Sequence, residues 1–467
     1  MGIIHHDQQQ EEEALILSSS DQTQHFHCHQ QPKDSNLISK VSVESMKLWL
    51  IAGPSIFSRL AMFSMTTITQ SFAGHLGDLN LAAISIATTV IISITFGFLL
   101  GMASALETLC GQAYGAKQYQ MLGLYLQRSW IVLFICSILL LPLFIFAAPL
   151  LKFMGQPTEV ADQTGLVAIW LIPFHLSLPF QFTLQRFLQS QLKTAVIAWV
   201  CGVALAVHAL ISWIFVYKLR VGIVGTALTL DFSWWLTVLG FFVYVVYGGC
   251  PLSWTGFSTQ AFSELWDFVK LSLASGVMIL TLIIVSGYLH NTETAVDALS
   301  ICMSIFGWES MIPLGFLAAT GVRVANELGA GNAKDAKFAT IVSVITSLAV
   351  GILFWLIIMA FHETLAMIFT SSSSVITMVN KYSTLLAFTI PLNCIQPVLS
   401  GSYYLVGVPL GVLFGWLQFG ITGIWAGMLC GTVVQTLILA VITMKCKWEI
   451  EARKARSYIS NETASYQ

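Results

Sequence analysis

Long apolar segments follow one another from Lys47 towards the C terminus, separated by short polar breaks. A helix needs about 20 apolar residues to cross a bilayer, and most of these segments reach that length, whereas barrel strands have about 10 residues of alternating polarity. The pattern therefore predicts an all-α polytopic membrane protein with twelve transmembrane helices. The predicted spans are 48–70, 81–103, 130–151, 165–188, 195–217, 222–247, 268–289, 296–320, 338–361, 379–400, 402–418 and 421–444.

Composition supports this class of protein. Hydrophobic residues make up 56% of the 467 residues and charged residues only 9%, against about a quarter charged in soluble domains. The formal net charge of −2 gives no electrostatic reason to expect nucleic-acid binding. The nine cysteines are scattered and form no C-x-x-C pair, so we expect neither a metal site nor a cofactor. We find no nucleophile–base arrangement that indicates an enzyme.

The distribution of Lys and Arg predicts the orientation of the chain. With both termini inside, sixteen of these residues lie on the cytosolic side and four on the other. We therefore expect both termini in the cytosol. The predicted regions are a disordered cytosolic tail at 1–45, an N-lobe of six helices at 46–250, a cytosolic linker at 251–267, a shortened C-lobe at 268–444 and a cytosolic tail at 445–467.

The two halves resemble each other. LAAISI at 81–86 pairs with VDALSI at 296–301, an offset of 215, and the glycine turn YGA at 114–116 pairs with LGA at 328–330, an offset of 214. Such repeats are typical of secondary transporters, whose substrate sites lie between the halves near the midplane of the membrane. We therefore predict two six-helix pseudo-repeat lobes.

The same repeat indicates that the second half is short in two places. The offset falls from 223 at Lys270 to 213 at Gly287, and from 211 near residue 395 to 198 at Gly420. About 10 residues of span seven and 13 between spans ten and eleven are therefore missing relative to the first half. We expect a structure to be distorted near 276–290 and 398–420.

Several segments carry a family resemblance. SALETLCGQAYGA at 104–116 and VRVANELGAG at 322–331 resemble the plant DETOXIFICATION proteins of the multidrug and toxic compound extrusion (MATE) family. The resemblance covers about residues 44–456. Other segments that fit it are GPSIF at 53–57, QSFAGHLGDLNLAA at 70–83, LQRFLQSQ at 184–191, SWWL at 233–236, DALSICMSIFGWESMIP at 297–313 and QPVLSG at 396–401.

The resemblance implies a MATE-like fold with a central cavity between the lobes and a secondary antiporter that works by alternating access. It implies small organic solutes as substrates (xenobiotics, flavonoids or other plant metabolites) and protons or sodium as the coupling ion. The most similar subgroup includes proton-coupled vacuolar carriers and therefore favours protons. We expect a monomer in the lipid bilayer of the vacuolar or plasma membrane. The family's Leu-Glu-Asn-Trp-Tyr-like segment of span seven is absent from GVMILTLIIVSG at 276–287. The alternative is therefore an inactive or regulatory form.

Polar residues inside the spans are the candidate site, because ionisable groups within a membrane are costly and commonly functional. Glu309 is the candidate for proton exchange. Asp297 could assist it or could cap the start of its helix. Asp231 could assist it or could make a structural hydrogen bond. Asn393 stands where many relatives carry aspartate, so it and Gln396 could hydrogen-bond a substrate.

Charges beside the two glycine turns are the candidate gate. Glu107 and Glu327 could pair with Arg128 or Arg323 and close the inward side, or could be solvated loop charges. Arg59, inside span one, could pair with a carboxylate or extend to the membrane surface. His175 and His208 are better explained as hydrogen-bonded packing residues.

Overall fold

The computed structural model describes residues 37–263, 293–369, 387–395 and 443–466, with isolated positions at 265, 266, 269, 379, 383, 433, 436, 437, 440 and 441. Contacts divide the chain into Met1–Met46 and Lys47–Gln467. In the first unit the described residues 37–46 are helical, as the start of α2. The second unit, in its described parts, consists of helices and turns without strands.

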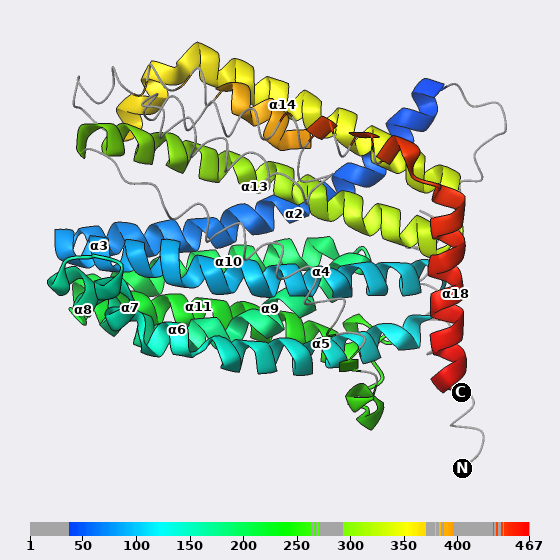
Figure 1. Ribbon diagram of the computed structural model, residues 1–467, viewed down its shortest axis with the longest axis horizontal. Helices are drawn as coiled ribbons and strands as arrows, with labels where there is room; N and C mark the ends of the chain where they lie inside the picture. The colour runs from blue at the N-terminus through cyan, green and yellow to red at the C-terminus, as the bar shows by residue number, and fades with distance from the viewer. Residues whose placement is uncertain are drawn as a thin grey trace. The chain divides into compact units, whose positions relative to one another are not determined.

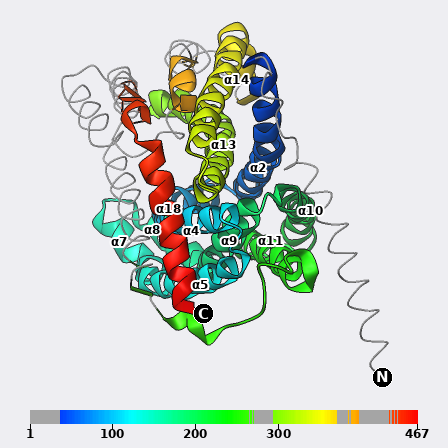
Figure 2. The ribbon, with the colours of Figure 1, turned by 90° about the vertical axis from the view of Figure 1, so that its right-hand side faces the viewer.

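The first half of the second unit contains the remainder of α2 and a group of helices that pack against one another (Figure 1). Contacts join α4 to α9 and α5, α9 to α11, and α10 to α11, and Figure 2, which looks along the helices, places these five together. Their bounds are α2 Leu37–Gly74, α3 Asp78–Ile86, α4 Ser93–Gly115, α5 Tyr119–Leu140, α6 Pro142–Ile145, α7 Ala147–Phe153, α8 Thr158–Trp170, α9 Ile172–Ser190, α10 Thr194–Trp213 and α11 Ile223–Tyr244.

The described part of the second half is smaller. It contains α13 (Glu293–Gly329), α14 (Ala333–Phe369), a helical segment at 387–395 and α18 (Trp448–Tyr466). The expected distortions at 276–290 and 398–420 lie outside the described residues, as does most of the spans expected at 268–289, 402–418 and 421–444.

Seven described helices are long and apolar enough to cross a membrane, or eight if the bent pair α8–α9 is one span. The helices extend beyond the apolar segments that predicted them. The span expected at 81–103 belongs to a run of helix from Asp78 to Gly115, and that expected at 130–151 begins at Tyr119. Polar residues in the added turns, among them Glu107 and Arg128, are buried by neighbouring helices. Hydropathy alone therefore ended these spans too early.

The break between α8 and α9 bends the chain by 49°. Pro173 stands in the first turn of α9, where a missing N–H costs little. Its carbonyl accepts a hydrogen bond from Trp235 Nε1 of α11 at 2.9 Å. The polar groups that a broken helix leaves inside a membrane must find partners in neighbouring helices, and α11 supplies one here.

Buried His208 joins three helices of the first half. Its ring contacts Ser233 Oγ of α11 at 2.9 Å and Thr69 Oγ1 of α2 at 3.2 Å, and Ser212 of its own helix lies at 3.5 Å. His175 is likewise buried, with Nε2 at 2.9 Å from the carbonyl of Ser137. Both histidines are thus hydrogen-bonded within the packed helices, in agreement with the expected packing role.

Candidate functional site

Glu309 and Asn393, which the sequence indicates separately, meet in the structure. Glu309 lies in α13, is only 4% exposed, and receives long contacts at both carboxyl oxygens. Asn393 Nδ2 lies 3.5 Å from Oε2, and Cys394 Sγ lies 3.5 Å from Oε1. Asn393 Nδ2 is also 3.4 Å from Ser310 Oγ. The distances from the Asn393 amide are at the outer limit of hydrogen bonding, and a thiol is a weak donor, so both contacts to the carboxyl group are weak and come from neutral donors.

The third wall of this cluster is α14. Ser347 Oγ donates a hydrogen bond to the carbonyl of Cys394 at 2.7 Å. A Cβ atom on Gly351 would lie 2.7 Å from Cys394 Sγ, so this position has room for glycine only. Sequence reasoning missed Ser310, Cys394, Ser347 and Gly351. The first two adjoin residues that it singled out, and the last two become visible only when the helices are packed.

Pro313 stands four residues after Glu309 within α13. Proline has no N–H, so it cannot make the helical hydrogen bond to the carbonyl of Glu309. The backbone next to the buried carboxyl therefore has an acceptor that the helix itself does not satisfy. Backbone carbonyls that lack a helical partner are found at transport sites, because a membrane protein tolerates them where they line a cavity or are buried in the protein.

Two other predicted members cannot be placed beside this cluster. Asp297 lies in α13, but its side chain is outside the described residues, and Gln396 is outside them altogether. The described residues contain no group of three or more His, Cys, Asp or Glu side chains that could hold a metal ion. The arrangement offers proton exchange at one carboxyl group and hydrogen bonding by one amide.

Asp231 lies elsewhere, at the bend between α8 and α9. It is 5% exposed, and its Oδ1 accepts a hydrogen bond from the backbone N–H of Phe174 at 3.1 Å. Asp231 thereby satisfies one of the free N–H groups at the start of α9, where the helix dipole favours a negative charge. Its Oδ2 is buried with no hydrogen-bond partner within the described part of the chain.

Helices α4 and α13 touch through small residues at their C-terminal ends. A Cβ atom on Gly111 would lie 2.5 Å from Ala325 Cβ, and one on Gly115 would collide with the carbonyl of Asn326. One on Gly329 would in turn collide with the carbonyl of Gln112. We call this the α4–α13 contact.

The α4–α13 contact follows the internal repeat. Gly115 and Gly329 are 214 residues apart, and so are their contact partners, Gln112 and Asn326. Each helix therefore places its glycine against the equivalent carbonyl of the other. The glycine turns that reveal the repeat in the sequence are the surfaces by which the two halves meet.

A buried ion pair lies beside this contact. Glu107 Oε2 is 2.7 Å from Arg186 Nη1 of α9, and both side chains are almost fully buried. Arg59 of α2 interacts electrostatically with both groups. A Cβ atom on Gly321 of α13 would lie 2.7 Å from Glu107 Oε1. Removing one member of such a pair commonly costs about 3–5 kcal/mol, because it leaves the other charge buried alone.

This pairing corrects one expectation. Glu107 forms an ion pair with Arg186, which the sequence did not propose as its partner. Hydropathy cannot identify which arginine of another helix will face a carboxylate, and Arg186 lies in a different helix, within the segment LQRFLQSQ. Glu107 is also not a solvated loop charge, because it lies inside α4 and is buried.

Glu327 does have a predicted partner. Its Oε1 lies 2.9 Å from Arg323 Nη2, one helical turn away, and its Oε2 accepts a hydrogen bond from Asn332 Nδ2 at 3.0 Å. Arg128 is 2% exposed within α5. The pair of Arg323 and Glu327 thus exists at the end of α13, while its gating role stays a prediction.

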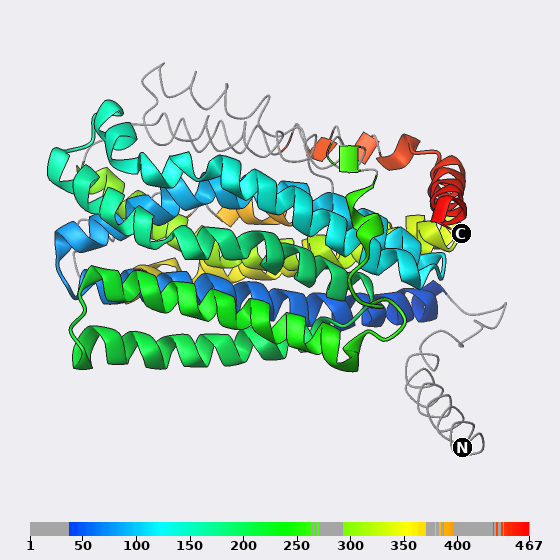
Figure 3. The same cartoon turned by 90° about the horizontal axis from the view of Figure 1, so that it is seen from below.

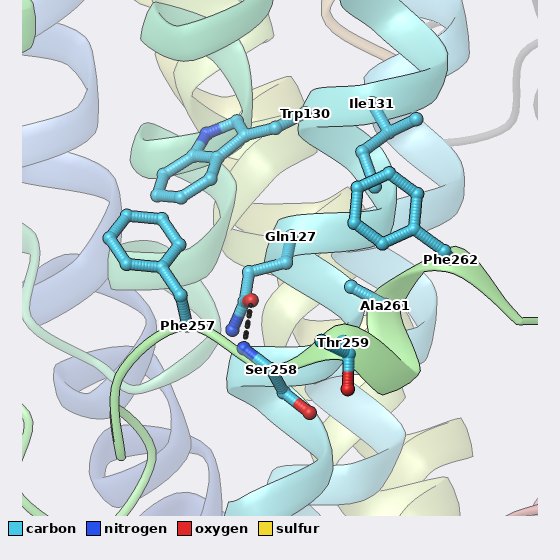
Figure 4. A pocket seen from close by; sticks show the side chains of 8 residues that line it. All are labelled: Gln127, Trp130, Ile131, Phe257, Ser258, Thr259, Ala261 and Phe262. Atoms are coloured by element: carbon cyan, nitrogen blue, oxygen red, sulfur yellow. Dashed lines mark hydrogen bonds between the residues drawn. The ribbon is translucent and has the colours of Figure 1, made fainter.

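The segment after α11 is fastened to α5. Gln127 donates to the carbonyl of Gly256 at 3.0 Å and accepts from the N–H of Ser258 at 2.8 Å. A small pocket of about 270 Å³ forms there, with Trp130 and Phe257 on one side of Gln127 and Phe262 on the other (Figure 4). Its described lining contains no ionisable residue. We attribute to it a role in holding this segment to the first half.

Comparison with known proteins adds a family to this geometry. A family model described as MatE matches residues 54–214 and 268–413. Protein DETOXIFICATION 27 of Arabidopsis thaliana is 56% identical over 450 residues, which cover 91% of this chain and 93% of the relative. Protein DETOXIFICATION 26 of the same plant is 51% identical over 455 residues, covering 92% and 93%.

Solved structures agree with these relatives. The crystal structure of the eukaryotic MATE transporter AtDTX14 matches with a TM-score of 0.85 and 30% identity, covering 90% of this chain and 99% of that one. A Vibrio cholerae MATE transporter matches with a TM-score of 0.73 at 17% identity, covering 88% and 100%, and supports the fold alone. The predicted all-α MATE-like fold is thus confirmed.

The role of Asp231 at the bend can be tested by stability. Asp231→Ala removes the acceptor at the start of α9 and should lower the free energy of unfolding by about 1 kcal/mol. Asp231→Asn keeps a side-chain oxygen there and should remain close to the native chain. Thermal unfolding of the detergent-purified protein measures both. An equal loss in the two variants would show that the charge, and not the acceptor oxygen, stabilises the bend.

Proposed function

This chain belongs to the MATE family of efflux transporters, and from that premise we propose that it is an antiporter that exchanges protons for small organic solutes. The solute class comprises xenobiotics, flavonoids or other plant metabolites. We place the transporter as a monomer in the vacuolar or plasma membrane, with both termini in the cytosol. The excess of Lys and Arg on one side of the predicted spans supports this orientation.

The observation that carries the proposal is the contact of Glu309 with Asn393. A buried carboxyl group within a transmembrane helix is costly and commonly marks an ion pathway. Here its contacts in the described residues are two neutral donors at 3.5 Å, and no described cation forms an ion pair with it. A carboxyl group without a fixed counter-ion can lose and regain a proton more readily than one in a salt bridge.

Proton and solute compete for this cluster. When Glu309 is ionised, its oxygens accept from Asn393 Nδ2 and Cys394 Sγ. A solute displaces these weak contacts and binds to the ionised carboxylate, whereas protonation of Glu309 removes that negatively charged acceptor, so the proton and the solute exclude each other. Asp297 and Gln396 belong to the same proposed site. In the first half, the buried and unpartnered Oδ2 of Asp231 is the proposed site of a second transported proton.

Alternating access requires a gate, and we assign the inward gate to the α4–α13 contact. In this structure the two helices touch there, which under the proposed orientation corresponds to a closed inward side. Glu107 lies beside the contact and Glu327 lies near the end of α13, each with its arginine. Access from the inward side requires α4 and α13 to separate, and their small residues make this contact tight when closed.

A second candidate function is an inactive or regulatory form. The alignment with DETOXIFICATION 27 runs over 450 positions although 91% of this 467-residue chain takes part, so the relative has residues that this chain lacks. This observation supports missing residues in the chain, and the repeat is what assigns them to the second half.

Neutralising Glu309 tests the proton site. Glu309→Gln should reduce proton-gradient-driven uptake to the level of empty vesicles, because glutamine cannot carry the exchanged proton, and should leave membrane insertion intact. The assay follows a fluorescent organic cation and a flavonoid glycoside. Glu159→Gln is the matched control, because Glu159 is exposed at the start of α8. Native uptake by Glu309→Gln would remove Glu309 from the coupling mechanism.

The gate can be locked by a disulfide. Gly111→Cys combined with Ala325→Cys, in a Cys110→Ser background, places two thiols on Cβ positions that face each other across the contact. The helices need to separate by only about 1 Å to reach ordinary disulfide geometry. Oxidation should stop uptake, and a reductant should restore it.

The two single cysteine variants are the controls for this lock, and mass measurement shows whether the disulfide has formed. Unchanged uptake by the cross-linked protein would mean that the α4–α13 contact does not open during transport.

The shortened chain can be compared directly with a restored one. If the segments expected to be missing are needed, uptake should appear only after both are inserted from DETOXIFICATION 27. The measurement is the same vesicle assay, normalised to the amount of inserted protein. Equal uptake by the two chains would exclude the inactive form and support the antiporter.

A further inference from the structure

A cationic cavity lies where the start of α14 meets the start of α18. It has a volume of about 420 Å³. Figure 1 shows α18 crossing the ends of the transmembrane helices, and Figure 3 shows it end-on at the same end of the molecule. Its contacts are with α13, α14 and α4. The charged residues that line the cavity are Lys334, Lys337, Lys447, Arg453 and Glu449. Four cations thus face one carboxylate.

The nearby acids do not offset this charge. Glu451 of α18 is paired with Lys454 at 2.9 Å, outside the cavity. Asp335 is in the first turn of α14 but does not line the cavity. Lys334 and Lys337 are three residues apart and therefore on one face of their helix. Like charges gathered in this way repel each other, so an anion in the cavity would stabilise the arrangement.

Trp448 supplies a donor at the same place. It lines the cavity, and its indole N–H is buried without a hydrogen-bond partner within the described part of the chain. The N terminus of α14 adds a partial positive charge. Lysines and arginine, a helix N terminus and an indole N–H are together the donor set that recognises phosphate.

An apolar track leads away from the cavity along α14. Ile341 and Ile345 follow Lys337 at successive intervals of four residues, so the three lie on one face of the helix. Ile341 is 46% exposed and Ile345 is 62% exposed, and both belong to a helix apolar enough to span a membrane. A phosphate at the lysines with acyl chains along these isoleucines matches the layout of a lipid.

We propose that this cavity binds the phosphate headgroup of an anionic lipid. The orientation proposed above places the cavity at the cytosolic surface, where anionic lipids are concentrated and where basic pockets beside transmembrane helices receive their headgroups. The proposal rests on the proposed function only for that orientation, because the binding itself needs no transport.

A lipid bound in the cavity would also affect how the two halves are joined, because α18 contacts both. Its Ile459 is 1% exposed and belongs to the hydrophobic core of the first half, whereas its first residues line the cavity with α14 of the second half. A headgroup held between α14 and α18 therefore tightens the link that α18 makes between the two halves. It favours the state in which the α4–α13 contact is closed.

The test measures lipid binding by the purified full-length chain with native mass spectrometry. The probes are dioleoyl phosphatidic acid and, for comparison, dioleoyl phosphatidylcholine. We expect preferential binding of phosphatidic acid. The variant Lys334→Gln/Lys337→Gln should weaken that binding by about thirtyfold, which follows from the free energy that each basic residue contributes near an anionic headgroup. Both lysines are exposed, so the variant should keep the native fold.

The matched control is Lys117→Gln/Lys218→Gln, which removes the same charge from exposed residues that do not line the cavity. It should retain native affinity. Equal binding of the two lipids, or equal weakening in both double variants, would overturn the proposal. Competition by soluble glycerol 3-phosphate at the same concentration would also overturn it, because the site would then recognise free phosphate.

Discussion

The close approach of α4 to α13 is the constraint on which the rest of the structure depends. Without a hydrophobic driving force between helices in lipid, tight association needs small residues that let the backbones touch. Gly111, Gly115 and Gly329 supply them, and each would meet the opposite helix if it carried a side chain. Because the two halves touch there, the pair of Glu107 and Arg186 is enclosed beside the contact.

The contact is symmetric in backbone but not in charge. Gly115 and Gly329 play the same part, yet Glu107 faces Gly321, its equivalent 214 residues further on. The first half thus holds a carboxylate with an arginine at 2.7 Å, and the second half holds Glu309 with neutral donors at 3.5 Å. In the proposed mechanism the first carboxylate stays ionised in its ion pair, and the second changes its protonation. The two halves of the repeat therefore differ in the partners of their buried carboxyl groups, which are an arginine in the first half and neutral donors in the second.

The sequence alone was sufficient for features that depend on local hydropathy or on polar residues that are rare within apolar segments. It predicted the helices of the first half and the glycine turns. It also singled out Glu309 and Asn393, since polar groups stand out in apolar spans, and the structure brings these two within 3.5 Å of each other. It failed where packing decides. Arg186 lies 79 residues from Glu107 in the sequence, and Asp231 lies 57 residues from Phe174, whose backbone N–H donates to it. The ends of the helices were also predicted wrongly, because a hydropathy scale assigns polar residues such as Glu107 to loops even where neighbouring helices bury them.

Helix α14 connects the proposed sites of the second half. Ser347 and Gly351 hold the backbone of the segment that carries Asn393 and Cys394, and Lys334 and Lys337 line the cavity beneath α18. The non-helical residue recorded in this helix is Phe361, beyond both sites. Between Lys337 and Ser347 the helix rises about 15 Å as one rigid element. A displacement at Ser347, caused by a change of protonation at Glu309, would therefore reach the cavity and α18, and through α18 the side of the molecule where α4 and α13 meet.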